Sequence, residues 1–112
     1  MIFSLFVNGS PTTSIDRSHA FQTAKAVLAS GHELYRVFFY AEGVLHAIED
    51  LNSAKETWQT LAAGTATDLC FCSGSVKTYD VLFSSKHANV SIGGLVQLLD
   101  AQLHSDRVVS IN

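Results

Sequence analysis

Three apolar runs, separated by segments of helical periodicity, constrain the fold of this chain more than any other feature. They are Ile2–Val7, Leu34–Tyr40 and Thr67–Phe71. Runs that are apolar at nearly every position are typical of strands covered on both faces. Strands that alternate with helices favour a parallel sheet with a layer of helices on each side. The sequence therefore predicts an α/β fold, a three-layer α/β/α sandwich with an open, mainly parallel sheet of about five strands.

Helical spacing of apolar residues predicts the elements between and after these runs. The first helix has Ser14 or Asp16 as candidate caps, and a later one has Asn52 or Ser53. Two short runs of branched residues predict further strands. The expected elements are helices over 16–30, 44–48, from 53 to a stop at Gly64, and from Gly93 to His104, with strands at Val90–Ile92 and Arg107–Ile111.

Length and composition indicate one domain that meets other protein subunits. A chain of 112 residues fits a single domain, residues 1–112. Hydrophobic residues make up 47% and charged residues 15%, against an average charged content of about a quarter, so we expect part of the apolar surface to contact another subunit. The formal charge is −3 and no Lys/Arg cluster occurs, which argues against direct binding of nucleic acid.

The two cysteines and the N-terminal residues indicate a cytoplasmic protein. Cys70 and Cys72 fit neither a disulfide framework nor the four-ligand spacing of a zinc site, so we expect a reducing compartment, no metal and no cofactor. The apolar start lacks basic residues and stops at Asn8–Pro11, too early for a signal peptide or a membrane span.

Cys72 is the candidate catalytic residue. It ends the third apolar run and is followed by Ser73, Gly74 and Ser75, where a helix that is short or frayed can begin. Amide groups and the positive end of the helix dipole favour a thiolate at such a position, which makes the cysteine nucleophilic. The alternative is a cysteine that only fills the core. Cys70 lies on the same strand face and is expected to be structural.

Several other residues have a functional and a structural interpretation. His46, near the end of the second strand, is a candidate base, although a structural role is favoured. Lys77 and His87 are candidates to stabilise a negative sulfur, and His19 is a candidate ligand, but solvated positions are favoured for all three. A redox pair of Cys70 and Cys72 is disfavoured, because residues i and i+2 of a strand are near the limit of bridging distance.

Binding of phosphate or a nucleotide is a weaker alternative. Ser73–Lys77 can form a nest of amides for an anion, but the chain has no GxGxxG or GxxxxGK[ST] pattern. A nucleotide binder of the doubly wound type would instead have a pocket at Asn8–Thr13, beyond the carboxyl ends of the strands.

Three stretches of the sequence resemble the DsrE/TusD family of sulfur-relay proteins. These stretches are Ser18–Ala26, Gly31–Val44 with its pattern GHELxRVFFYxEGV, and Ser91–Val109. The resemblance covers nearly the whole chain and implies a three-layer α/β sandwich. It places the reactive cysteine of the family on Cys72, not Cys70.

The resemblance also implies partners and a pathway. A TusD-like subunit belongs to a hetero-oligomer with TusB-like and TusC-like subunits. It receives sulfur as a persulfide from a TusA-like donor and passes it to a TusE-like acceptor, for 2-thiolation of the wobble uridine of tRNA. Related DsrE subunits serve dissimilatory sulfur oxidation. The residues after Cys72 differ from the alanine-rich helix of the family, so a non-catalytic structural subunit stays an alternative.

Overall fold

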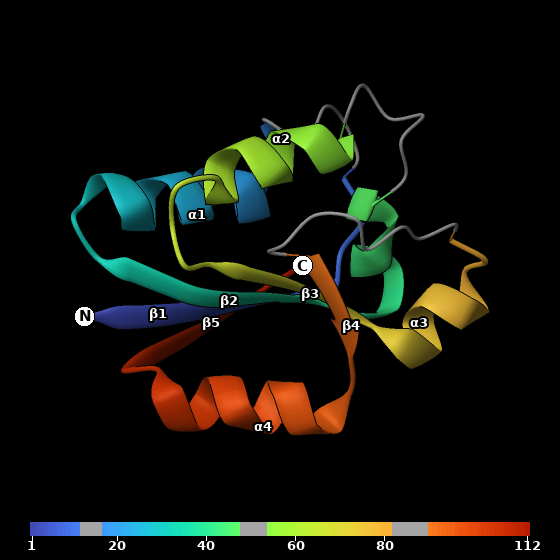
Figure 1. Ribbon diagram of the computed structural model, residues 1–112. Coiled ribbons are helices and arrows are strands. Elements are labelled where there is room, and N and C mark those ends of the chain that lie inside the picture. The colour runs from blue at the N-terminus through green and yellow to red at the C-terminus, as the bar shows by residue number, and fades with distance from the viewer. Residues whose placement is uncertain (12–16, 48–53, 82–89) are drawn as a thin grey trace.

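Five parallel strands form one sheet in the order β4-β3-β2-β1-β5 (Figure 1). The computed structural model describes residues 1–11, 17–47, 54–81 and 90–112. The strands are β1 (Ile2–Val7), β2 (Glu33–Phe39), β3 (Asp68–Cys72), β4 (Val90–Gly93) and β5 (Arg107–Ile111). Because all strands run the same way, their carboxyl ends meet at one edge of the sheet.

Helices cover both faces of this sheet, as the alternation of elements predicts. Figure 1 shows α1 and α2 on one face and α4 on the other, while α3 projects from the carboxyl edge. A 3₁₀ helix, η2, follows β2 directly and contacts α3. The helices are α1 (His19–Ala29), η2 (Ala41–Ala47), α2 (Ala54–Ala62), α3 (Ser73–Thr78) and α4 (Leu95–His104). The three-layer sandwich is therefore confirmed.

The larger of the two hydrophobic clusters lies between the sheet and the helices α1 and α2. Phe39 and Phe71 on neighbouring strands stack with ring centroids 4.5 Å apart. Trp58 of α2 meets Phe39 edge to face at 5.1 Å, and Phe21 of α1 meets Trp58 at 5.2 Å. Aromatic pairs of this kind contribute about 1 kcal/mol each beyond the burial of their area. They fix which face of β2 and β3 is turned toward α1 and α2.

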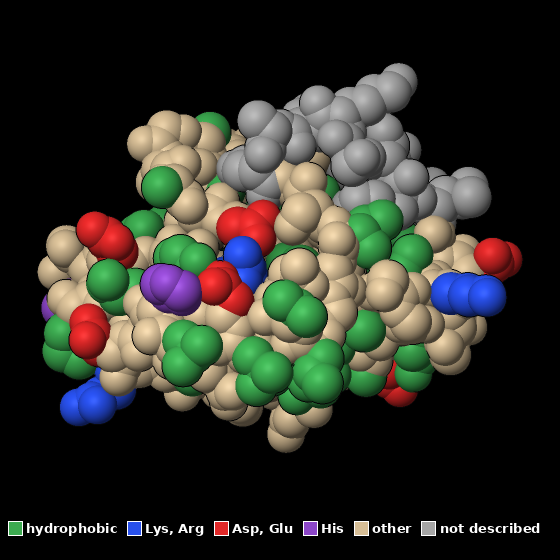
Figure 2. All heavy atoms as spheres, turned by 60° about the horizontal axis from the view of Figure 1, so that its bottom comes forward, with side chains coloured by type: hydrophobic (Ala, Val, Ile, Leu, Met, Phe, Trp, Pro, Cys, Tyr) green, Lys and Arg blue, Asp and Glu red, His purple; other side chains and the backbone are tan. Residues whose placement is uncertain are grey.

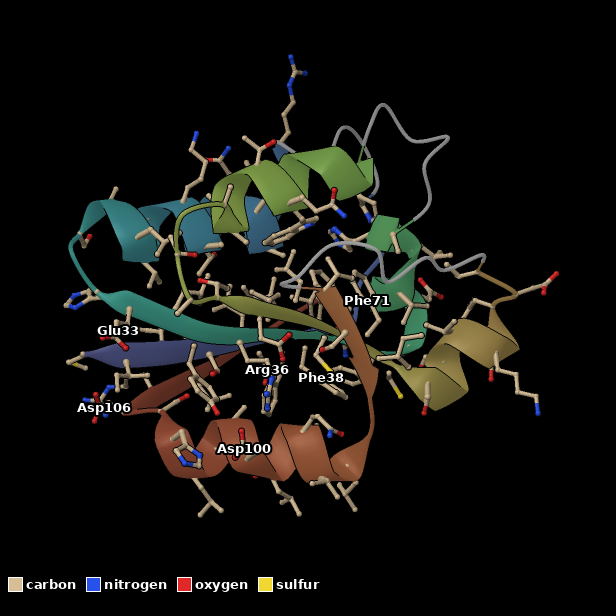
Figure 3. All side chains as sticks on the ribbon, in the orientation of Figure 1. Glu33, Arg36, Phe38, Phe71, Asp100 and Asp106 are labelled. Atoms are coloured by element: carbon tan, nitrogen blue, oxygen red, sulfur yellow. The ribbon has the colours of Figure 1, made fainter. Side chains whose placement is uncertain are left out.

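A β-bulge in β2 turns two consecutive side chains toward α4. The register with β1 shifts between Phe3 and Ser4, so that Tyr35 and Arg36 both face α4. The Tyr35 hydroxyl donates to Asp100 Oδ2 at 2.6 Å, and Arg36 donates to the same oxygen at 3.0 Å and to Asp68 Oδ2 at 2.7 Å. Figure 3 shows Arg36 and Asp100 pointing toward one another between β2 and α4. These polar contacts hold α4 on the sheet beside a small cluster of Phe6, Phe38, Cys70 and Ala101.

The expected boundaries hold for most elements, with a correction at the first helix. α1 begins at His19 rather than at residue 16, because the hydroxyl of Ser18 accepts the amide of Phe21 at 3.2 Å and so caps the helix. The other candidate caps, Ser14, Asp16, Asn52 and Ser53, lie outside the described residues. The short helix expected over 44–48 starts earlier, at Ala41, as η2.

Replacing Arg36 with Met should destabilise the fold through the contacts with α4. The substitution keeps most of the apolar stem but removes the guanidinium from both carboxylates, leaving Asp100 with only the exposed His104 as a basic neighbour. We expect the free energy of unfolding in urea to fall by about 2 kcal/mol, less than for a fully buried pair because both carboxylates are partly exposed to water.

Arg107→Met, at an exposed residue of β5, is the matched control and should change the free energy of unfolding by less than about 0.5 kcal/mol. Equal effects of the two substitutions would show that the Arg36 contacts contribute nothing particular to stability.

Candidate functional site

Cys72 occupies the carboxyl end of β3 and the cap position of α3, where the sequence analysis placed it. Its backbone is extended, with φ −64° and ψ 121°, and α3 starts at the next residue. Its side chain is partly buried and packs against the cluster formed with Phe38 and Cys70. Its register partner on the neighbouring strand is Gly93, the last residue of β4, which precedes the N-cap of α4. The thiol is therefore reachable from solvent and has an apolar wall on one side.

Hydrogen-bond donors of α3 outweigh the effect of burial on the Cys72 thiol. Desolvation raises the pKa of Cys72, while the Ser75 hydroxyl and the amides of Ser75 and Gly74 lower it, and the net pKa lies below the ordinary value. The Cys72 side chain makes no capping hydrogen bond in the described geometry, so these donors act on the sulfur as nearby dipoles. Their field favours the thiolate, the nucleophilic form.

Ser75 is the site residue that the sequence analysis missed. Its side-chain oxygen accepts the amide of Ala41, the first residue of η2, at 2.8 Å. This bond joins α3 to the segment that leaves β2. The sequence carried one signal for it, because a polar side chain three residues after a cap position is the spacing of a capping box.

Cys70 has the opposite environment, as expected for a structural cysteine. Its side chain is fully buried. Burial raises the pKa of the Cys70 thiol, against a lowering effect of the Ser91 hydroxyl. Both cysteines are free thiols that contact the same small cluster, which confirms that they share a face of the sheet. Cys70 therefore stays protonated and enclosed.

His46 is a buried structural residue, the interpretation that the sequence favoured. Trp58 Nε1 donates to His46 Nδ1 at 3.0 Å, so the ring proton is on Nε2, which lies 3.1 Å from the carbonyl oxygen of Gly9. Desolvation lowers the pKa of His46 to about 4, against a raising effect of the bond to Gly9. With both nitrogens engaged and the ring against Phe39, His46 has no free position to act as a base.

The other candidates are not brought to the thiol. Lys77 is exposed in the last turn of α3, at the opposite end of that helix from Cys72. His19 is exposed at the start of α1. His87 lies outside the described residues. Within the described ranges, no three His, Cys, Asp or Glu side chains gather as a metal site requires. No helix in those ranges has the length and apolar character needed to cross a membrane.

A pocket lies at the carboxyl ends of β1 and β5, and its lining does not include Cys72. It is a pocket of about 410 Å³ lined by Gly9, Ser10, Arg17, Ser18, His19, Ala20, Glu42, His46 and Asn112. The sheet order places it at the point where the chain reverses its direction of winding, the usual ligand position in such sheets. It overlaps the segment Asn8–Thr13 of the nucleotide alternative, although residues 12 and 13 lie outside the described residues.

The molecule is a three-layer parallel α/β protein with a partly exposed thiol of lowered pKa at the carboxyl edge of its sheet. The sequence pattern of the DsrE/DsrF-like family matches residues 1–111, and the chain belongs to that family.

Two curated relatives and one solved structure are similar along nearly their whole length. The chain is 35% identical to the sulfurtransferase TusD homolog of Aliivibrio fischeri, over 97% of each protein. It is 29% identical, also over 97% of each, to DsrE of Allochromatium vinosum, whose name places it among the sulfurtransferases. The crystal structure of the ychN protein from E. coli superposes with a TM-score of 0.74 at 17% identity, over 99% of each chain, and so shares the fold.

His46 should make the stability of the protein depend on pH. Its folded pKa is about 4 and its ordinary value is 6.5, so between these values the unfolded chain binds a proton that the folded protein does not. The free energy of unfolding should therefore fall as the pH drops from about 6.5 to 4, by on the order of 3 kcal/mol from this residue. Urea unfolding at a series of pH values measures it.

His46→Gln should remove most of this dependence, since a neutral amide can still accept from Trp58 and donate to Gly9. His19→Gln, at an exposed position, is the matched control and should behave like the wild type. A variant at His46 with an unchanged pH dependence would rule out a buried neutral imidazole.

Proposed function

We propose that this protein is a sulfurtransferase that carries sulfur as a persulfide on Cys72. The observation that carries the proposal is the position of a partly exposed thiol with a lowered pKa at the start of α3. Membership of the DsrE/DsrF-like family and similarity to two proteins named as sulfurtransferases support it.

The transfer consists of two exchanges at sulfur. In the first, the Cys72 thiolate attacks the outer sulfur of a donor persulfide, a new S–S bond forms, and the donor leaves as a thiolate. In the second, an acceptor thiolate attacks the outer sulfur of the Cys72 persulfide, and Cys72 leaves as a thiolate. Each step replaces one S–S bond by another, so no external oxidant or reductant is required. The lowered pKa of Cys72 favours both its attack and its departure.

The proposed destination of the sulfur is the wobble uridine of tRNA, as a 2-thio group. The similarity to a TusD homolog supports this branch, with a TusA-like donor and a TusE-like acceptor. The similarity to DsrE supports the alternative, a subunit that serves dissimilatory sulfur oxidation. Measurement of wobble 2-thiouridine in the tRNA of cells that carry Cys72→Ser distinguishes the branches, because loss of the modification is expected only in the first.

We also propose that the outer face of α4 joins homologous subunits in a hetero-oligomer. The large apolar residues Leu95, Val96, Leu99 and Leu103 are between 48% and 83% exposed. Figure 2 shows hydrophobic side chains gathered on the face that α4 forms, with charged side chains beside them. Contiguous apolar surface of this kind is typical of subunit contacts.

The alternative is a non-catalytic subunit in which Cys72 is inert and the chain only completes an oligomer. Alkylation of the thiol across a range of pH values separates the two functions. A relay cysteine reacts at lower pH than an ordinary thiol, whereas an inert cysteine reacts slowly and with an ordinary or raised pKa.

Cys72→Ser should abolish sulfur transfer while leaving the fold intact. The hydroxyl replaces the thiol in a partly exposed position, so the free energy of unfolding should change little, but no persulfide can form. The measurement is transfer of labelled sulfur from a persulfidated donor protein, followed by mass spectrometry for one extra sulfur atom on the peptide that contains Cys72.

Cys70→Ala is the matched control, because it removes the buried thiol and should keep the transfer even if it lowers stability. Undiminished labelling of the Cys72→Ser protein would refute the relay.

Charges placed on the outer face of α4 should break the assembly. We expect the double variant Leu95→Glu and Leu103→Glu to stay monomeric when it is co-expressed with its homologous subunits, because carboxylates would have to be desolvated in the contact. Sedimentation velocity measures the assembly.

Ala26→Glu, at an exposed residue of α1 on the opposite side of the sheet, is the control and should assemble normally. Normal assembly of the double variant would exclude α4 as the contact.

A further inference from the structure

Ser75 lies three residues after Cys72, in the first turn of α3. Cys72 is the cap residue, and Ser75 is the third residue of the helix that follows. A side chain at the third position of a helix lies on the same side as the cap residue, which is why these two positions pair in capping boxes. The Ser75 side chain is half-buried, whereas Ser73 and Gly74 of the same turn are exposed.

The Ser75 hydroxyl is held by a bond from outside its own helix. Ala41 N–H donates to Ser75 Oγ at 2.8 Å. Ala41 has a left-handed backbone, with φ 50°, which a residue other than glycine adopts at a cost and keeps only where its surroundings hold it. Because a hydroxyl has a single hydrogen, an oxygen that accepts the bond from Ala41 still has its own hydrogen to donate.

We propose that Ser75 stabilises the sulfur anion at Cys72, with Ala41 fixing the position of its hydroxyl. The hydroxyl donates to the sulfur once Cys72 is a thiolate or carries a terminal persulfide anion, and this bond is stronger than one to a neutral thiol. The proposal rests on the proposed function, since it assigns to Ser75 the control of charge on the sulfur that is transferred.

Two observations support this role. Among the groups that lower the pKa of Cys72, the Ser75 hydroxyl has the largest effect. The bond from Ala41 also ties α3 to η2, so the helix that carries the amides of Gly74 and Ser75 keeps its place beside the sulfur. Ser73 lies in the same turn on the exposed side, which makes it a natural control.

The test is the pH dependence of Cys72 alkylation by iodoacetamide in the full chain, read by mass spectrometry of the peptide that contains Cys72. Ser75→Ala should raise the apparent pKa of Cys72 by about one unit. At pH 7 the alkylation rate should then fall about threefold, because the thiolate fraction drops about tenfold while each thiolate becomes about threefold more nucleophilic. Ser73→Ala should leave both values unchanged.

Ser75→Thr and Ser75→Val form a second pair, which decides the question if Ser75→Ala fails to fold. The two side chains have nearly the same shape and differ in the hydroxyl, so Thr should keep the low pKa and Val should raise it. Equal profiles for Thr and Val, or for Ala and wild type, overturn the role of Ser75.

The same data separate failure of this inference from failure of the proposed function. A wild-type Cys72 with an ordinary or raised pKa overturns the persulfide relay. A low wild-type pKa that Ser75→Ala leaves unchanged overturns only the inference about Ser75.

Discussion

The parallel pairing of β3 with β2 and β4 is the constraint on which the site depends. The register pairs Phe39 with Phe71 and Phe38 with Cys70. The first pair faces one side of the sheet and the second pair faces the other. The stack of Phe39 on Phe71 directs Phe71 toward α1 and α2. Because side chains alternate along a strand, Cys72 must then face the side of α4, and a shift of one residue would move it to the opposite face. Packing of aromatic rings in the core thus decides where the thiol lies.

Much of this arrangement could be predicted from the sequence, because it depends on local patterns. The runs Ile2–Val7 and Arg107–Ile111 are strands with the expected bounds. Cys72 is at the junction of strand and helix because the apolar run stops there and small polar residues follow. The structural role of His46 was also favoured, since no partner for a base was visible in the sequence.

The remainder could not be predicted because it depends on contacts between distant segments. The bond from Ala41 to Ser75 spans 34 residues and requires the left-handed backbone of Ala41. The bulge in β2 that turns both Tyr35 and Arg36 toward Asp100 is set by pairing with β1. The helix start at His19 depends on a choice among several polar residues that can all cap. In the first two cases contacts between distant segments override the local backbone preference, and a single sequence does not show those contacts.

Cys70 and Cys72 together show how the fold shifts the pKa of two neighbouring thiols in opposite directions. The two residues belong to one strand and one face, and desolvation is the largest influence on the pKa of each. For Cys70, which is fully buried, desolvation prevails and the pKa rises. Cys72 is the last residue of the strand, and there the donors of α3 outweigh desolvation, so the pKa falls. The lowering of the pKa at Cys72 does not come from a charged partner, because every group that lowers it is a neutral hydroxyl or amide. A fixed cation would hold the negative sulfur of the proposed Cys72 persulfide more strongly than neutral donors do and would slow its release. In the proposed relay, where sulfur is taken up from one protein and given to another, neutral dipoles therefore suit the site better than an ion pair would.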